Sequence, residues 1–232
     1  MKNMIASLVT STIFFSVCHA ETTPPFSATA PCFKGAYVGM SLNTSTAKAD
    51  LLSTTPASGE IMAGDMATYF GLWAGYGWVK NQIYFGGEVG HTFENIKINN
   101  DQFTIGGGPQ TLTRNGSTNV GVRIGYIPVP GTMIYGGVNA IDGKWNALDN
   151  NYSLAGVTLT GSSRRLSWAP LLGVEIGIGS KVRVRAQYAY EFGPNVKATS
   201  STSNLITQFN SIRNQTFTLG VSFKFGVPPF TS

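Results

Sequence analysis

Residues 179–193, GSKVRVRAQYAYEFG, alternate between apolar and polar side chains along most of their length. Val182, Val184 and Ala186 begin the apolar series, and Arg183 and Arg185 begin the polar one. A period of two predicts a β-strand with one apolar and one polar face. Which of the two faces meets water decides what kind of protein this is.

Seven further segments repeat this pattern. The eight segments are 34–43, 67–79, 82–93, 118–127, 132–141, 164–178, 181–192 and 214–225. Their connections alternate in length: 80–81, 128–131 and 179–180 are short, whereas 44–66, 94–117, 142–163 and 193–213 are long and rich in Ser, Thr, Asn, Gly and Asp. An even number of strands with short turns at one end and long loops at the other is typical of an outer-membrane barrel. We therefore predict an all-β fold: an eight-stranded antiparallel up-and-down transmembrane β-barrel over residues 34–225, with short periplasmic turns and four long extracellular loops.

A soluble, lipocalin-like barrel is the alternative, and it would turn the same apolar faces inward. Periodicity alone does not separate the two arrangements. The apolar faces carry Phe70, Trp78, Phe192, Phe217, Phe223 and Phe225. Eight strands enclose little more than their own side chains or one small ligand, so these aromatic residues favour an outward, lipid-facing position.

The two ends of the chain have their own signals. Residues 1–20 combine Lys2, an apolar run and a final Cys-His-Ala, which predicts a secretory signal peptide cleaved after Ala20. The Pro-rich residues 21–33 predict a flexible leader, and residues 226–232 (GVPPFTS) a periplasmic tail. Cys32 is then the one cysteine of the mature chain, so no intramolecular disulfide is expected.

Charged residues make up only 12% of the chain, and the 16 basic and 11 acidic residues form no cluster, so nothing indicates nucleic-acid binding. The charges within the strands share the polar face. On the membrane model they form a barrel-interior set: Glu88, Arg123, Glu175, Arg183, Arg185, Glu191 and Lys224. Such a set could line a narrow pore or form a salt-bridge network. We favour the network, because so narrow a barrel leaves little free space.

Catalytic and metal-binding patterns are weak. His91 is the only histidine beyond the signal peptide, and it shares the outward face of Phe85 and Phe93, without a serine partner. No cluster of His, Cys and Asp has the spacing of metal ligands. We expect no enzymatic activity, no cofactor and no metal.

Several stretches together resemble the small outer-membrane barrels of the OmpA-like and opacity-protein surface-antigen group of Gram-negative bacteria. They are 33–39 (FKGAYVG), 172–175 (LGVE), 182–193 and 217–225. The resemblance implies an outer-membrane location and a terminal strand, marked by Phe217, Phe223 and Phe225, that the barrel-assembly machinery recognises. The tail after Phe225 departs from the family pattern, in which the terminal aromatic residue closes the chain.

The expected function is that of a surface structural or interaction protein, which supports envelope integrity or contacts a host surface through its long loops. A narrow porin-like channel is the first alternative, and a soluble lipocalin-like ligand-binding barrel is the second. The expected partners are outer-membrane lipid or lipopolysaccharide, the barrel-assembly machinery and host surface molecules.

Overall fold

The structure, a computed structural model, describes residues 32–53, 61–100, 110–149, 158–199 and 206–225. The described chain is all β, as predicted. Its strands are β1 (Gly35–Ser53), β2 (Ile61–Lys80), β3 (Ile83–Asn100), β4 (Gln110–Val129), β5 (Thr132–Asp149), β6 (Leu159–Ile178), β7 (Val182–Phe192), β8 (Val196–Thr199) and β9 (Ile206–Lys224). The expected signal peptide, most of the expected leader and the expected tail lie outside the described residues. No helix in the described part of the chain is long and apolar enough to cross a bilayer.

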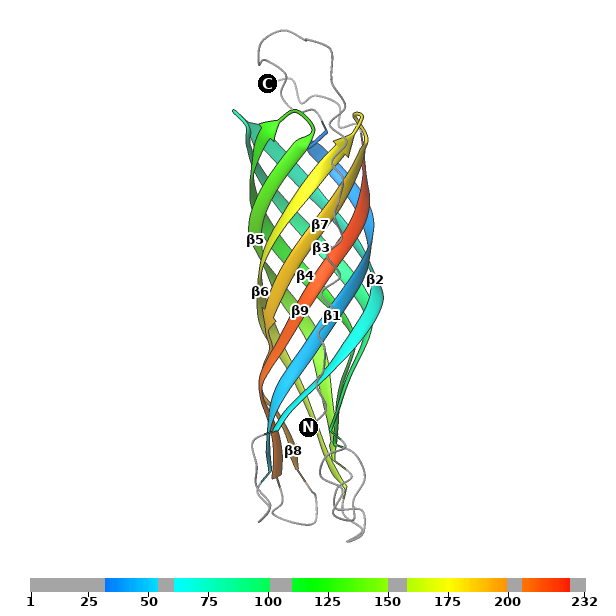
Figure 1. Cartoon of the computed structure of the whole chain (residues 1–232), viewed down its shortest axis with the longest axis vertical. Coiled ribbons are helices and arrows are strands. Elements are labelled where there is room, and N and C mark those ends of the chain that lie inside the picture. Colours follow the sequence, from blue (N-terminus) through cyan, green and yellow to red (C-terminus); the bar gives the residue numbers. More distant parts are fainter. Residues whose placement is uncertain (1–31, 54–60, 101–109, 150–157, 200–205, 226–232) are drawn as a thin grey trace, which may run out of the picture.

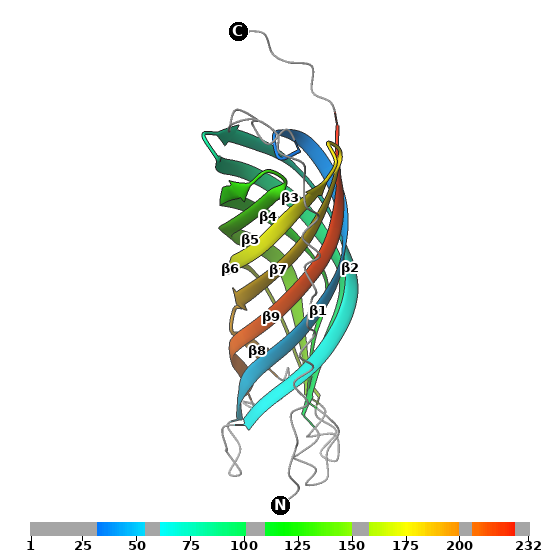
Figure 2. The ribbon, with the colours of Figure 1, turned by 45° about the horizontal axis from the view of Figure 1, so that its top comes forward.

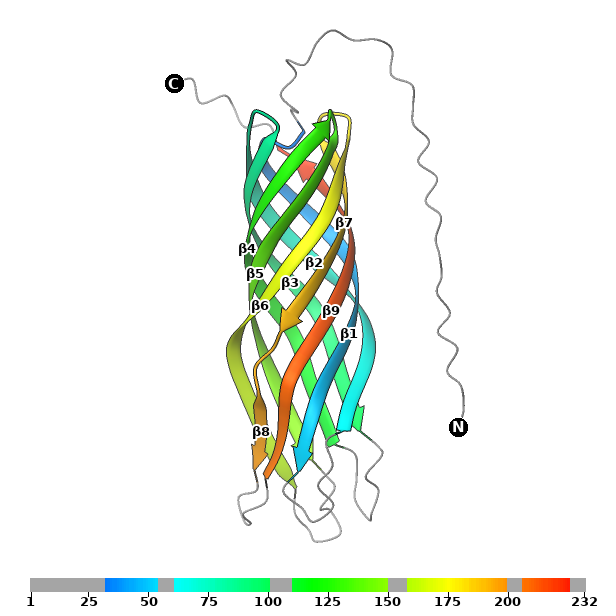
Figure 3. The same ribbon diagram turned by 60° about the vertical axis from the view of Figure 1, so that its left-hand side comes forward.

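Strands β1 to β7 pair antiparallel in sequence order, β7 pairs with β9, and β9 pairs with β1, which closes the sheet into a barrel (Figure 1). The short β8 continues the course of β7 after a break at residues 193–195, and both pair with β9 (Figure 3). Counting β7 and β8 as one wall element, the described strands form a ring of eight. The predicted eight-stranded up-and-down topology is confirmed.

Tight turns join the strands at one end of the barrel, at the top of Figure 1. Asn81 and Gln82 have φ of 49° and 69°, and Gly131 and Gly179 have φ of 83° and 68°. This left-handed region is open to glycine and is tolerated by Asn, which allows the chain to reverse within a few residues. The three short connections of the sequence therefore form the end that the fold assigns to the periplasm.

The strands are longer than the sequence pattern predicts, so much of each expected long loop is strand (Figure 2). The sequence pattern underestimated the strand lengths because the apolar face and the polar face of each strand exchange sides of the wall toward the loop end. On β1, Met40 and Leu42 point outward, but farther toward the loop end Lys48 is exposed while Ala47 and Ala49 are buried inside. The loop-end part of the wall is thus polar outside and apolar inside, the pattern of a water-soluble barrel.

The turn-end part of the wall shows the opposite pattern, and it decides against a soluble barrel. Large apolar side chains are exposed around its circumference, with roughly half of their area accessible. They include Leu72, Trp78, Phe85, Val122, Ile124, Ile134, Leu172, Val184, Leu219 and Phe223. Such a band matches the lipid-facing surface of an outer-membrane barrel.

Two apolar clusters occupy the interior, one at each end. The cluster at the loop end is centred on Trp145 and includes Ile96, Leu112 and Phe209. The cluster at the turn end contains Tyr84 and Met133, together with Cys32, Phe33, Ile127, Tyr135, Leu171 and Ala189. Cys32 and Phe33 were expected in a flexible leader, but they are 4% and 0% exposed, because their side chains fill the periplasmic mouth of the barrel.

Candidate functional site

A layer of charged and polar side chains lies inside the barrel between the two apolar clusters. Six of the seven predicted interior charges are buried, with 1–6% of their area exposed; they are Glu88, Arg123, Glu175, Arg183, Arg185 and Glu191. The seventh, Lys224, is half-buried at the last position of β9, at the turn end of the barrel. The buried charges form two groups at different heights.

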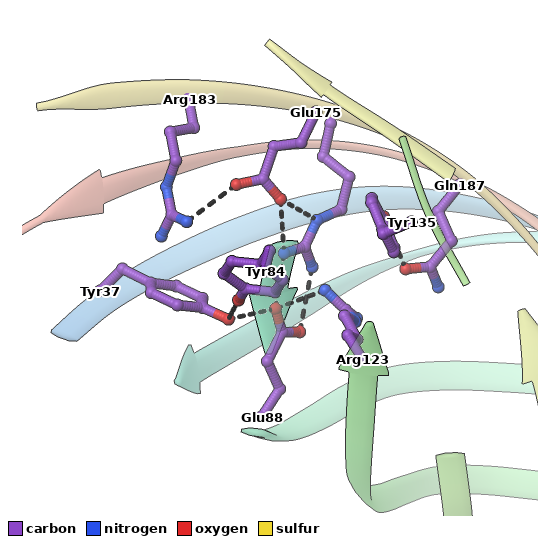
Figure 4. Close-up of polar contacts among 9 residues, drawn as sticks. Tyr37, Tyr84, Glu88, Arg123, Tyr135, Glu175, Arg183 and Gln187 are labelled. Atoms are coloured by element: carbon purple, nitrogen blue, oxygen red, sulfur yellow. Dashed lines mark hydrogen bonds and ion pairs between the residues drawn. The ribbon is translucent and has the colours of Figure 1, made fainter. Parts of the chain in front are cut away.

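Arg185 is the centre of the group nearer the turn end. We call this group the lower cluster because it lies on the periplasmic side, although Figure 1 draws that end at the top. Figure 4 shows the two carboxylates of the cluster, Glu88 and Glu175. Its Nε and Nη2 atoms donate to Glu175 Oε2 at 3.0 and 2.9 Å. Its Nη1 and Nη2 atoms donate to the two carboxylate oxygens of Glu88 at 3.0 and 2.5 Å. Arg185 therefore bridges two carboxylates with the fork geometry that makes Arg–carboxylate pairs strong.

Two further arginines belong to the lower cluster, which therefore holds three cations and two carboxylates. Arg123 forms an ion pair with Glu88, and Arg183 Nη1 lies 2.9 Å from Glu175 Oε1. Arg183 also stacks on Tyr37, with its guanidinium carbon 3.7 Å from the ring centroid, and the Tyr37 hydroxyl donates to Glu88 at 2.7 Å. Three guanidinium groups thus share two carboxylates, and each guanidinium also lies over an aromatic ring, of Tyr37, Trp73 or Tyr135.

Strand register explains why these groups meet. Glu175 and Arg185 are direct partners across the β6–β7 hairpin. Glu88 is on β3, which does not pair with β7, so its contact with Arg185 crosses the barrel interior. Glycines on the inner face leave space for these side chains. At Gly75, for example, a Cβ would lie only 2.6 Å from the Tyr37 hydroxyl.

Arg114 is the centre of the second group, the upper cluster, which lies nearer the loop end. Its Nε and Nη2 atoms contact Glu94 at 2.7 and 3.1 Å, and its Nη1 donates to Glu191 at 2.5 Å. Its guanidinium carbon lies 4.6 Å from the ring centroid of Trp145, and Asn214 donates to the second oxygen of Glu191 at 3.2 Å. The partner of Glu191 is thus a residue that the sequence pattern did not place inside the barrel.

Arg114 and Glu94 were missed because they fall in the expected long loop 94–117. The strands continue through this region, but a β-bulge interrupts the pairing of β4 with β5 between Arg114 and Ser117. Gly116, with φ of 76°, lies in this bulge. The bulge shifts the inward positions of β4 by one residue, so the buried Arg114 does not share the parity of Arg123. Gly116 stands where the inward positions of β4 change from even to odd residue numbers. A glycine at that point was the sequence signal that could have indicated the bulge.

A polar cavity of about 90 Å³ lies between the two clusters. Its lining includes Glu88 and Arg185 from the lower cluster and Glu94, Arg114 and Glu191 from the upper one. Polar side chains from the intervening wall also face it: Ser41, Asn43, Thr92, Asn119, Asn139, Gln187 and Thr218. This volume accommodates several water molecules, which would satisfy polar atoms such as Asn139 Oδ1 that have no protein partner.

His91 lies on the outer surface, where its Nδ1 is 3.1 Å from the Thr118 hydroxyl and its ring packs edge-on against Phe93. Within the described residues, no group of His, Cys, Asp and Glu side chains has an arrangement that could hold a metal ion. Of the expected assembly signal, Phe217 and Phe223 are exposed at 48% and 46% on the outer face of β9, and Phe225, directly after the strand, is exposed at 55%.

Comparison with known proteins places this architecture in a family. The family model of the outer membrane protein beta-barrel domain matches residues 10–225. The chain belongs to this family. Its location is accordingly the bacterial outer membrane, with the apolar band in the lipid. A comparison with curated proteins found no match.

Solved structures of two outer-membrane proteins share the fold. OprG from Pseudomonas aeruginosa is 15% identical, with 85% of this chain and 99% of that chain covered and a TM-score of 0.58. The outer membrane protein AlkL, determined in lipid bilayers by solid-state NMR, is 14% identical, with 92% and 100% covered and a TM-score of 0.52. At these identities the likeness concerns the fold alone.

Proposed function

We propose that this outer-membrane barrel is a non-conducting scaffold that presents its extracellular connections to molecules outside the cell, as a surface structural or interaction protein. The observation that carries this proposal is the filling of the barrel. Two interior ion-pair clusters lie in series, and an apolar cluster lies beyond each of them. An ion crossing the barrel would have to separate paired charges and pass an apolar layer at each end, and both steps are costly.

The tall wall supports the same proposal. The strands continue beyond the apolar band as a β-structure with its own apolar core around Trp145. This extension carries the loop-end termini of the strands beyond the apolar band on a rigid base. Binding residues are commonly found on loops that such a scaffold positions. The partners would be host surface molecules or neighbouring envelope components.

Bilayer recording and loop replacement test the two halves of the proposal. Purified folded protein should give no unitary current in planar bilayers at any salt concentration. Replacing residues 54–60, 101–109, 150–157 and 200–205 by short Gly-Ser turns should leave the barrel folded but abolish adherence of producing bacteria to surfaces or cells. A regular single-channel conductance, or adherence that persists without all four segments, would contradict it.

The polar cavity favours a narrow channel as the second candidate function. Its volume lies on the barrel interior between the two clusters, where a permeation path would have to run. A channel of this kind would open when the ion pairs of the lower cluster rearrange. It would show current that rises when Glu88 and Arg185 are both replaced by alanine, whereas a scaffold would only lose stability.

A further inference from the structure

Lys48 and Arg213 face each other across the seam where β1 and β9 close the barrel. They are direct partners in the β1–β9 register, at the position where a bulge interrupts the pairing. Both are exposed, and their buried neighbours Ala47, Ala49 and Ile212 show that the two side chains point outward. Directly opposed residues on neighbouring strands have Cβ atoms about 5 Å apart, and like charges in this position destabilise a sheet.

A second cationic pair on the barrel shows how such repulsion is relieved. Lys144 and Arg164 are direct partners between β5 and β6, and there Asp142 accepts two hydrogen bonds from Arg164, at 3.0 and 2.7 Å. At the seam, no ion pair among the described residues involves Lys48 or Arg213. The one carboxylate nearby on that face of β1, Asp50, does not pair with them. The seam pair therefore leaves two positive charges for an external anion.

The surroundings of the pair show what kind of anion fits. On its other side Arg213 is paired with Phe192, which is 57% exposed and lies at the edge of the apolar band. The next outward row toward the turn end contains Tyr190, Gln215 and Thr46. These rows run across β7, β9 and β1, which lie side by side (Figure 3).

Along β1 and β9 toward the loop end, the outer surface is therefore first apolar, then uncharged and hydrogen-bonding, then cationic, and on β7 the exposed Phe192 lies beside the cations. Phe217, two residues from Gln215 on β9, belongs to the apolar part and is 48% exposed. This order matches a glycolipid with acyl chains in the membrane and a phosphorylated sugar headgroup at its surface. Cationic side chains at a membrane surface attract anionic lipid headgroups, and Arg binds phosphate oxygens with a pair of N–H donors.

We propose that the Lys48–Arg213 pair binds a phosphate group of a phosphorylated glycolipid of the outer leaflet. The phosphate would accept from both cations, which converts their repulsion into two ion pairs. The acyl chains would lie along the aromatic surface of β7 and β9 below. This site is independent of the proposed role of the extracellular connections, since it lies on the outer face of the barrel wall, on the loop-end side of the apolar band.

Native mass spectrometry of the full-length folded protein in phosphatidylcholine nanodiscs tests the site, with bis-phosphorylated lipid A as the probe. The double variant K48Q/R213Q should retain about tenfold less lipid A than the wild type, a loss of about 1.4 kcal/mol, because both charged contacts to the phosphate are removed. The matched control K144Q/R165Q removes the same net charge from exposed positions of β5 and β6 and should retain lipid A as the wild type does. Lipid A stripped of both phosphates should be retained equally poorly by all three proteins.

Three results would overturn the proposal. Equal losses in the two double variants would show that general positive charge attracts the lipid. Undiminished retention of the dephosphorylated lipid would show that the phosphate is not recognised. Displacement of lipid A by millimolar inorganic phosphate would assign the pair to a free anion instead. Unchanged heat-modifiable migration of K48Q/R213Q in detergent gels verifies its fold, and the charge-conserving exchange K48R/R213K should keep its lipid A.

Discussion

Arg114 on β4 and Glu191 on β7 meet across the interior of the barrel at 2.5 Å, although 77 residues separate them in the sequence. Their strands do not pair with each other, so the contact acts as a transverse brace. The Arg185–Glu88 contact between β7 and β3 is a second brace, nearer the turn end. Both braces start from β7, which therefore connects the two clusters.

Arg185→Ala should lower thermal stability strongly without opening a channel. The substitution leaves each of Glu88 and Glu175 with one arginine partner but removes the four buried hydrogen bonds from Arg185 to them. Hydrogen bonds to charged groups contribute about 1.5–3 kcal/mol each. The temperature at which the folded band disappears from detergent gels measures the loss. Arg164→Ala is the control, since its pair with Asp142 is exposed and should matter little. A large bilayer current at unchanged stability would contradict the prediction.

Arg114→Met should loosen the loop-end part of the barrel more than the lipid-embedded part. The substitution leaves two buried carboxylates, Glu94 and Glu191, without their shared cation. Hydrogen exchange should increase in the amides around Trp145 while those around Glu88 stay protected. The triple variant E94Q/R114M/E191Q carries no uncompensated charge and should recover much of the protection. Uniform exchange across both regions would show that the upper cluster has no local role.

Gly39→Ala should impair closure of the barrel. A Cβ at this position would lie 2.4 Å from the Trp73 ring and 2.7 Å from the Val221 carbonyl oxygen, next to the β1–β9 seam. Overpacking of this kind costs about 1–3 kcal/mol. Gly87→Ala is the matched control, because a Cβ there meets nothing within 4 Å. The folded fraction after refolding into detergent should fall for the first variant and not for the second.

Cys32 should react slowly with maleimide in the folded barrel at pH 8 and rapidly after boiling. Burial in the periplasmic mouth raises the pKa of its thiol, so the reactive thiolate is scarce at this pH, and access is limited. Protein lacking residues 1–20 avoids interference from Cys18. A Ser180→Cys substitution in a Cys32→Ser background places the thiol on an exposed turn and should label equally fast before and after boiling. Fast labelling of folded Cys32 would indicate that the mouth is open.

The sequence pattern was sufficient for the lipid-embedded part of the barrel, because there the alternation of apolar and polar residues has a constant sense. Arg123, Arg185 and Glu175 could be placed on the inner face for this reason. Nearer the loop end the alternation persists with its sense exchanged, so Ile96 and Trp145 looked like loop residues in polar surroundings. At Gly116 the bulge also shifts the register, and a period-two pattern cannot carry a strand across such a shift. Only the last two residues of the expected leader, Cys32 and Phe33, were placed wrongly, because their burial depends on the barrel mouth that surrounds them and not on a local sequence pattern.

The exchange of polarity along the strands also sets how deep the barrel sits in its membrane. If it sank by a few residues, Lys48 and Arg213 would enter hydrocarbon, where a cation on the lipid face costs up to about 2–4 kcal/mol at the midplane. If it rose, Leu42 and Phe217 would be transferred to water. Both displacements cost free energy all around the circumference, so the polarity pattern of the wall fixes the depth at which the barrel sits in the membrane. Whatever the chain carries at its outer rim is held at a constant distance from the cell surface.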